Sequence, residues 1–267
     1  MKHMKIIKCF GVLFMASLCG HAQVLETNQI MSDVYSDTVR NGTTVCAVGP
    51  ILGGAATDFA SLSVQAVTLG KGPTLQPGSS DKVEEMIIVK EGRLRITING
   101  EGKNVGPGSV AVVMPGDTRS FSNAADGETT YYELRYHSKK PPDAERGKKA
   151  GGSFIMDWND VKYVPREDGA GGTRQFFSRA TTMGARMDLH ATQLEPGKSS
   201  HDPHHHRAEE MIIMLDGEVE EYLGPAEKGG KSKQATSHDI IFLRSNEYHA
   251  IRNIGTKPAL YFAFQFE

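Results

Sequence analysis

Cysteine is scarce in this chain, which has three in 267 residues: Cys9, Cys19 and Cys46. The first two lie in an N-terminal stretch that we expect to be removed, so the mature chain would keep Cys46 alone. A single cysteine excludes an intramolecular disulfide, even in an oxidising compartment. No histidine or other base lies near Cys46 in the sequence, so the run Thr-Val-Cys-Ala-Val predicts a small buried residue and not a nucleophile.

Long apolar runs are also lacking. The apolar stretch at residues 10–18 is too short to span a membrane. Three lysines precede it and Ala22 follows it, which is the order of a secretory signal peptide cut after Ala22. We therefore expect residues 1–22 to be removed and the protein to be exported, either periplasmic or secreted. A lipid anchor through Cys19 is the second alternative, because Leu18 is large for a lipoprotein signal.

Positive charge is not in excess. Lysine and arginine number 30 against 32 acidic residues, and the formal net charge is −2. Loss of residues 1–22 removes three lysines and no acid, which lowers the charge to −5. No basic patch is interleaved with aromatic residues, so we expect no nucleic-acid partner. A phosphate-binding glycine loop, a Gly-x-Ser-x-Gly elbow and a Cys–His pair are also absent. Any chemistry would come from a bound metal, and the expected partner is a small molecule.

The chain does contain an internal repeat. Leu-Gln-Pro-Gly at residues 75–78 returns as Leu-Glu-Pro-Gly at 194–197, and Glu-Glu-Met-Ile-Ile at 84–88 returns unchanged at 209–213. The aromatic segment at 131–136 is matched by the one at 261–266. A five-residue identity within equivalent spacings indicates duplication of a unit somewhat over 100 residues long.

The residues within each copy favour an all-β fold. Short β-branched and aromatic runs alternate with glycine, proline, asparagine and aspartate, and no segment shows a sustained helical period. In the first copy we expect strands at 83–89, 93–98, 109–114 and 129–136, repeated in the second. Two β-barrels or sandwiches are predicted, at residues 23–137 and 153–267. The charged segment 138–152, rich in proline and glycine, predicts an exposed linker between them.

A metal site is predicted in the second copy. His204 and His206 are two residues apart, so on an extended segment they point the same way. Glu210 begins the next strand, and His249 ends a later strand and turn. Imidazole and carboxylate together suit Mn, Fe, Co, Ni, Cu or Zn. We therefore expect one divalent transition-metal ion per chain, held by these four residues.

At these residues the sequence resembles the cupin superfamily. Its first motif is matched by Gly197, His204, His206, Glu210 and Gly217, with one residue more than usual before the first histidine. Its second motif is matched by His249 and Asn253. The positions of the glycine, proline and glycine of that motif hold other residues: His238, Arg244 and Asn246. The resemblance covers nearly all of the mature chain and implies two tandem cupin domains, which are jelly-roll type β-barrels.

The first copy retains the frame of the motifs but not the histidines. Glu85, Gly92, Gly108, Gly116 and Asn123 are kept. The three histidine ligand positions hold other residues: Ser79, Asp81 and Arg119. Because an arginine repels a cation, we expect the first barrel to be metal-free and structural.

Other residues are candidates for roles around the metal. His201 could line the mouth of the barrel or act as an acid or base, and it is our candidate catalytic residue. His205 should face away from its neighbours. Strand phase cannot be set to one residue from the sequence, so the candidate substrate contacts are those that could reach the lumen: Tyr222, Tyr248, Tyr261 and Gln265.

Three functions follow from this pattern. Bicupins with such a site include dioxygenases, oxalate decarboxylases, sugar isomerases, lyases and ureidoglycine aminohydrolases. The first hypothesis is therefore an exported metalloenzyme for a small chelating substrate such as a hydroxy acid, sugar acid or ureido acid. Its reaction would be isomerisation, hydrolysis, decarboxylation or dioxygenation. The alternatives are a non-catalytic binding protein for a small ligand or carbohydrate, and an interaction protein with a structural metal. The sequence leaves the oligomeric state open and is compatible with a homo-oligomer.

Overall fold

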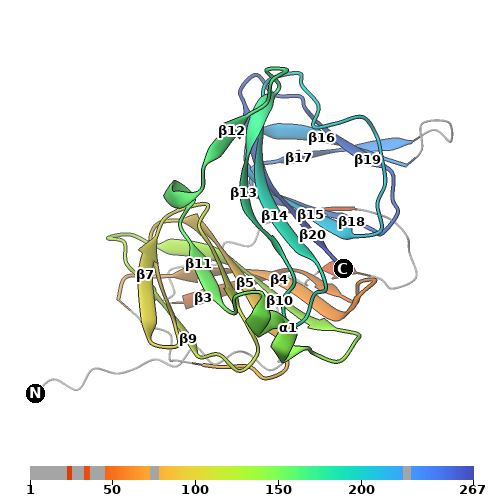
Figure 1. Ribbon diagram of the computed structural model, residues 1–267. Helices are drawn as coiled ribbons and strands as arrows, with labels where there is room; N and C mark the ends of the chain where they lie inside the picture. The colour runs from red at the N-terminus through yellow and green to blue at the C-terminus, as the bar shows by residue number, and fades with distance from the viewer. Residues whose placement is uncertain (1–22, 26–32, 37–45, 73–77, 225–229) are drawn as a thin grey trace, which may run out of the picture.

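The computed structural model describes residues 23–25, 33–36, 46–72, 78–224 and 230–267. Within these ranges the chain forms two β-barrels side by side, one for each copy of the repeat (Figure 1). The predicted all-β fold of two similar domains is confirmed. The expected signal peptide, with Cys9 and Cys19, lies outside the described residues, as does the side chain of Cys46.

Each barrel consists of a large and a small sheet. In the first barrel the large sheet has the order β1-β3-β4-β10-β5-β8-β11, and the small sheet has the order β7-β6-β9. The strands are β1 (Gln23–Leu25), β3 (Cys46–Gly54), β4 (Phe59–Leu69), β5 (Glu84–Glu91), β6 (Leu94–Ile98), β7 (Glu101–Val105), β8 (Val110–Val113), β9 (Arg119–Asn123), β10 (Thr129–Ser138) and β11 (Phe154–Met156).

The second barrel repeats this plan. Its large sheet has the order β12-β13-β14-β20-β15-β18-β2, and its small sheet has the order β17-β16-β19. The strands are β2 (Asp33–Ser36), β12 (Tyr163–Pro165), β13 (Gly171–Arg179), β14 (Met187–Leu194), β15 (Glu209–Asp216), β16 (Glu218–Leu223), β17 (Lys231–Thr236), β18 (Asp239–Leu243), β19 (His249–Asn253) and β20 (Ala259–Phe266).

The barrels exchange edge strands. β2 precedes all of the first barrel's central strands, yet it pairs with β18 of the second barrel, Ile240 opposite Tyr35. β11 follows the segment predicted as the linker, yet it pairs with β8 of the first barrel, Ile155 opposite Ala111. The limits predicted for the two domains stay a prediction. Each barrel nevertheless includes one edge strand from outside its predicted limits: β11 in the first barrel and β2 in the second.

The large sheets pack against each other, with the small sheets at opposite ends of the molecule (Figure 1). One apolar core contains residues from both large sheets, including Met86, Leu134, Met211 and Phe264. Two further cores fill the two barrel interiors. Because every central strand has one face toward the other barrel and one toward its own interior, both faces are buried, which explains why the Met-Ile-Ile runs are continuously apolar.

The first glutamate of each Glu-Glu pair joins the barrels. Oε2 of Glu84 accepts a hydrogen bond from the backbone N–H of Met183 at 3.1 Å. Oε2 of Glu209 accepts one from the backbone N–H of Thr57 at 2.6 Å. Each glutamate therefore bonds to a segment of the opposite copy. This reciprocal contact gives the first glutamate of each Glu-Glu pair a structural role.

The turns of the second motif keep their backbone form without glycine. Gly108 and Gly116 have φ of 78° and 90° in the first copy. In the second copy His238 has φ of 78° and Asn246 has φ of 61°. Left-handed backbone is rare outside glycine and asparagine, so its return at the replaced positions supports the motif alignment.

The segment between the barrels is short and docked. Residues 138–152 include a helix, α1 (Ala144–Lys149), capped by Asp143, whose side chain accepts from the N–H of Arg146. The Arg146 guanidinium in turn donates to the carbonyls of Thr181 and Thr182. Most residues of the segment 138–152 are exposed, as expected of a linker, but Gly147 is buried. A short 3-10 helix (Trp158–Asp160) follows. No helix in the described ranges has the length and apolar character needed to cross a membrane.

Candidate metal centre

The histidine loop before β15 is held against the start of β19. The N–H of His249 donates to the carbonyl of His204 at 2.9 Å, and the N–H of His204 donates back at 3.2 Å. The N–H of Asn246 donates to the carbonyl of His206 at 2.8 Å. These backbone bonds bring two segments at least 40 residues apart in sequence into contact, and they set the positions of the imidazoles.

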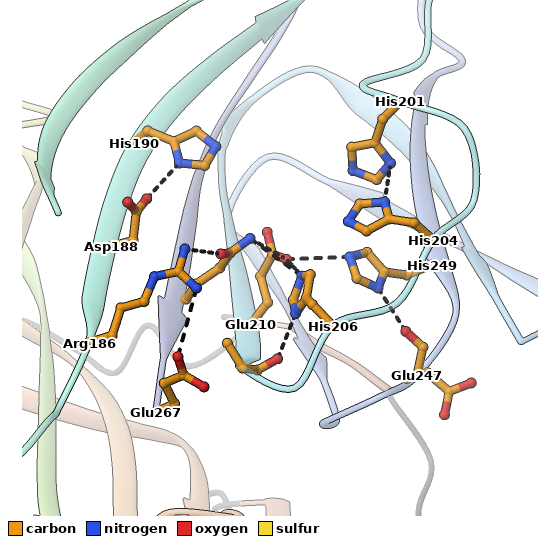
Figure 2. Close-up of polar contacts among 12 residues, drawn as sticks. Arg186, Asp188, His190, His201, His204, His206, Glu210, Glu247, His249 and Glu267 are labelled. Carbon is orange, nitrogen blue, oxygen red and sulfur yellow. Dashed lines mark hydrogen bonds and ion pairs between the residues drawn. The ribbon is translucent and has the colours of Figure 1, made fainter.

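His206, Glu210 and His249 converge on one point (Figure 2). Nε2 of His206 lies 3.1 Å from Oε2 of Glu210, and Nε2 of His249 lies 3.4 Å from the same oxygen. Glu210 and His249 are 6% and 4% exposed, so the carboxylate and one imidazole are almost fully removed from solvent. The three residues offer one ligand atom each, all within 4.8 Å of one another.

The other nitrogen of each imidazole is held by the backbone. Nδ1 of His206 lies 2.8 Å from the carbonyl oxygen of Ala208, and Nδ1 of His249 lies 2.9 Å from that of Glu247. A carbonyl can only accept, so both rings donate through Nδ1, and in the neutral form each ring presents Nε2 as the lone-pair nitrogen. In the protonated form, Nε2 of His206 instead donates to Oε2 of Glu210. Such outer hydrogen bonds orient histidines that bind metals.

The electrostatics of this group favour a cation. Burial by itself would raise the pKa of Glu210, but the hydrogen bond from His206 and the nearby His249 ring hold its pKa below the usual value. The hydrogen bond with Glu210, opposed by burial, raises the pKa of His206. Within the described residues, the buried Nε2 of His249 has no hydrogen-bond partner. An ionised carboxylate and a buried unpartnered nitrogen at one point fit a bound divalent ion.

His204 lies beside this group but turns toward His201. Its Nδ1 is 2.9 Å from Nδ1 of His201. His201, His204 and His249 form a second potential ligand group, which shares His249 with the first. Burial lowers the pKa of both His201 and His204, so both rings favour the neutral form that binds metals. The four predicted ligands therefore lie in two adjoining groups that share His249, with His201 as a fourth imidazole at the exposed side.

Gln265 is the predicted substrate contact that reaches the ligands. It lies opposite Glu210 on β20, and its Nε2 donates to Oε2 of Glu210 at 3.3 Å. Its Oε1 accepts from Arg186 at 3.3 Å. The amide therefore connects the candidate ligands to the exposed guanidinium of Arg186.

The three predicted tyrosines have different positions. Tyr261 is buried on the lumen face, and burial raises the pKa of its hydroxyl. Tyr248 is exposed and its ring contacts that of His205 at a tilted angle, with centroids 4.4 Å apart, away from the other imidazoles. Tyr222 alternates with the buried Val219, Glu221 and Leu223 of β16, so it faces outward. The structure does not bring Tyr222 or Tyr248 to the ligands.

Glu221 takes the inward position beside Tyr222, and our sequence reasoning missed it. Its side chain lies opposite Ile251 on β19, two residues from the pairing of Leu223 with His249. It is 1% exposed, and neither carboxyl oxygen has a hydrogen-bond partner among the described residues. The apolar residues at 219 and 223 were the available signal, because they place residue 221 on the same inward face.

The first barrel has an ion pair where the second has the candidate ligands. Arg119, at the position of His249, donates from Nε to Oε2 of Glu85 at 2.7 Å and from its terminal nitrogen to Oε1 at 3.1 Å. Arg135 adds a contact to Oε1 of Glu85 at 3.4 Å. The Glu85 carboxylate is thus already satisfied by positive charge, and the guanidinium fills the position that an ion would need.

Comparison with known proteins agrees with the geometry. A sequence model of the cupin domain matches the chain twice, at residues 66–134 and 191–264. No curated protein matches the sequence. A structure from Pseudomonas aeruginosa described as a glyoxylate-induced protein is 19% identical with a TM-score of 0.68, covering 95% of this chain and 97% of that one.

Two further solved structures share the fold. Protein Ylba from E. coli is 15% identical with a TM-score of 0.66, covering 90% of this chain and 95% of that one. A mutant of oxalate decarboxylase from Bacillus subtilis is 13% identical with a TM-score of 0.62, covering 87% of this chain and 76% of that one. At these identities the likeness establishes the bicupin fold alone.

Proposed function

Since the chain belongs to the cupin family, we propose that its second barrel binds one divalent transition-metal ion and that the protein is an exported metalloenzyme acting on a small chelating substrate. Substrates of this kind are hydroxy acids, sugar acids and ureido acids, and the reaction would be isomerisation, hydrolysis, decarboxylation or dioxygenation. The observation that carries the proposal is the convergence of two Nε2 atoms on one buried carboxylate oxygen.

Different residues of the second barrel would have different roles in this function. His204, His206, Glu210 and His249 would hold the ion, with the Nδ1 bonds of His206 and His249 to the backbone fixing both rings. When bound, such an ion polarises a chelated carbonyl and makes a neighbouring proton more acidic. Gln265 would orient Glu210, while His201 at the exposed side would exchange a proton with the substrate.

The first barrel argues against a purely structural ion. It reaches the same architecture with the Arg119–Glu85 ion pair at the equivalent point. A barrel of this design therefore does not need a metal to fold, and three buried or half-buried imidazoles are more than stability requires. The argument favours an ion that acts on a ligand.

Metal analysis of the purified mature protein tests this proposal. We expect about one transition-metal ion per chain and almost none after His206→Ala, because that change removes a ligand nitrogen. His205→Ala is the matched control: His205 is adjacent in sequence but its ring contacts Tyr248, so its loss should leave the metal content unchanged. Equal metal content in the two variants would contradict the site, and two tight ions per chain would contradict the metal-free first barrel.

Catalysis and export need their own measurements. A screen of hydroxy acids, sugar acids and ureido acids with the metal-loaded protein should yield turnover that His206→Ala abolishes. Binding without turnover would instead favour the non-catalytic alternative. N-terminal sequencing of protein from the cell envelope fraction should begin at Gln23. A mature chain that begins at a lipid-modified Cys19 would replace the free exported form with an anchored one.

A further inference from the structure

A buried carboxyl group without a partner lies in the barrel that holds the candidate metal centre. Both oxygens of Glu221 are inaccessible and lack hydrogen bonds within the described part of the chain. An unpaired ionised carboxylate in such surroundings is very unfavourable, so the group is expected to take up a proton. Burial, with a further contribution from the charge of Glu210, raises the pKa of Glu221 well above its usual range.

The first barrel shows what this position holds when no metal chemistry is needed. The register of β6 with β9 places Ile96 opposite Phe121, as the register of β16 with β19 places Glu221 opposite Ile251. Ile96 is fully buried within the apolar core of its barrel. The fold therefore accepts an aliphatic residue here, and a glutamate in the metal-binding copy is not explained by packing.

The titratable groups around Glu221 come from four strands. Glu210 on β15 and His249 on β19 belong to the candidate ligands, and Tyr261 faces the lumen from β20. Lys233 on β17 is the cross-strand neighbour and is partly exposed. Even with Lys233 beside it, neither oxygen of Glu221 has a hydrogen-bond partner among these residues.

The position of Glu221 relative to the ligands suits contact with a bound molecule. His249 lies opposite Leu223, and Glu221 is two residues further into the barrel, which corresponds to about 7 Å along the strand. A small chelating molecule on the ion would extend over a comparable distance. Both Glu221 oxygens are inaccessible in this structure, so the inference requires lumen side chains to move aside when the molecule binds. A neutral carboxyl group at its far side would then be a hydrogen-bond donor.

We propose that Glu221 is a second functional carboxyl group of the site, present as the neutral acid, which donates a hydrogen bond to an anionic oxygen of the chelating ligand. The inference rests on the proposed metal function and narrows its substrate class to carboxylates. An acid in this role selects for negative charge, because a neutral oxygen accepts a weaker hydrogen bond.

The protonation state is tested without metal. Infrared spectra of the metal-free protein near neutral pH should contain a protonated-carboxyl band that Glu221→Gln removes. Glu220→Gln is the matched control, because Glu220 is the preceding residue on β16 and is bonded to Ser232 on the outer face. Glu84, Glu133 and Glu209 also have raised pKa values through burial, so only the band lost in Glu221→Gln is assigned to this group. Identical spectra of Glu221→Gln and wild type would overturn the inference.

The hydrogen bond is tested by ligand binding. Cobalt(II)-loaded protein is titrated with oxalate as the probe by calorimetry. Wild type, Glu220→Gln and Glu221→Gln should bind similarly, because glutamine keeps a donor, while Glu221→Ile should bind about tenfold or more weakly. Equal affinity of Glu221→Ile and wild type would overturn the inference. The metal content of each variant is measured in parallel. A wild type that takes up no ion would contradict the proposed function. In that case the infrared spectra of the metal-free protein would still decide whether Glu221 is protonated.

Discussion

At the residue scale, one position separates the two barrels most clearly. Arg119 and His249 lie at equivalent points, and each faces the second glutamate of its repeat. The carboxylate at this equivalent position therefore pairs with a guanidinium in the first barrel and with imidazoles in the second. The loss of metal ligands predicted for the first copy has a structural counterpart in this ion pair.

Arg119→Ala should destabilise the first barrel. Glu85 is 2% exposed, so it would become a buried carboxylate whose remaining contact is the more distant one with Arg135. We expect a loss of about 3 kcal/mol in the free energy of unfolding, with metal content unchanged. Chemical denaturation measures the first quantity. Arg95→Ala, at an exposed site bonded to Asn104, should change stability by under about 0.5 kcal/mol; a similar loss in both variants would show that the ion pair has no special role.

Glu221→Ile should stabilise the protein while it weakens ligand binding. Removing a buried polar group without a partner should add about 1–3 kcal/mol, since isoleucine fits the equivalent position in the first barrel. The effect depends on pH. The folded-state pKa of Glu221 is raised, so unfolding releases its proton, and wild-type stability falls as pH rises above the ordinary glutamate value of about 4.3.

Melting temperatures measured from pH 5 to 8 test this prediction. The difference in melting temperature between Glu221→Ile and wild type should grow as pH rises. Only the wild type must keep the Glu221 carboxyl group protonated when folded, and this becomes less favourable at higher pH. A constant difference across this range would mean that Glu221 has the same charge in the folded and unfolded states.

At the scale of elements, the edge strands show which parts of the fold sequence reasoning can reach. The strands expected in the first copy correspond to β5, β6, β8 and β10, because alternation and turn residues are local signals. The pairing of β2 with β18 and of β11 with β8 joins segments far apart in the chain, and no local pattern encodes a partner.

Loss of β2 should expose the edge of β18. In a Val34→Pro and Tyr35→Pro double variant at least one backbone donor to β18 is removed, because alternate residues of an antiparallel strand face the partner. We expect the alternate amides of β18 that face β2 to exchange faster with solvent, while those that face β15 stay protected. Hydrogen exchange measures this difference.

A Val34→Thr and Tyr35→Thr variant provides the comparison, since threonine keeps the backbone donors. Unchanged protection of β18 in the proline variant would show that β2 contributes little to this sheet. Concentration-dependent association of the proline variant is also expected, because an uncovered edge strand can pair with another chain.

At the scale of the whole molecule, the two barrels form one unit. A single apolar core contains residues of both large sheets, and the ring of Phe59 stacks on Tyr136 at 4.9 Å and on Phe266 at 5.0 Å. The reciprocal bonds of Glu84 and Glu209 cross the same interface. The first barrel therefore supports the second directly, whatever other role it has.

We expect the two barrels to unfold in one cooperative transition. Separation would expose the shared core and leave the backbone N–H groups of Thr57 and Met183 without their acceptors. Calorimetry should give a single peak with calorimetric and van't Hoff enthalpies in agreement. A fragment of residues 153–267 should be insoluble when expressed alone. Two separated peaks, or a soluble folded fragment, would contradict a shared core.

The sequence by itself determined the features that depend on residue identity and spacing. It established the duplication, the all-β class and the cupin resemblance. It also predicted His206, Glu210 and His249, whose ligand atoms lie close to one another, and His204, whose ring lies beside that of His249. These features do not depend on which face of a strand points inward, because repeated motifs and residue types are properties of the sequence alone.

Only the tertiary structure decided which side chains share a face and which strands share a sheet. A shift of one residue in strand phase exchanges every inward side chain for its neighbour, so Tyr222 and Glu221 were equally compatible with the sequence. The register with β19 placed Glu221 inside. The exchanged edge strands and the common core likewise depend on contacts between distant segments, which no local pattern specifies.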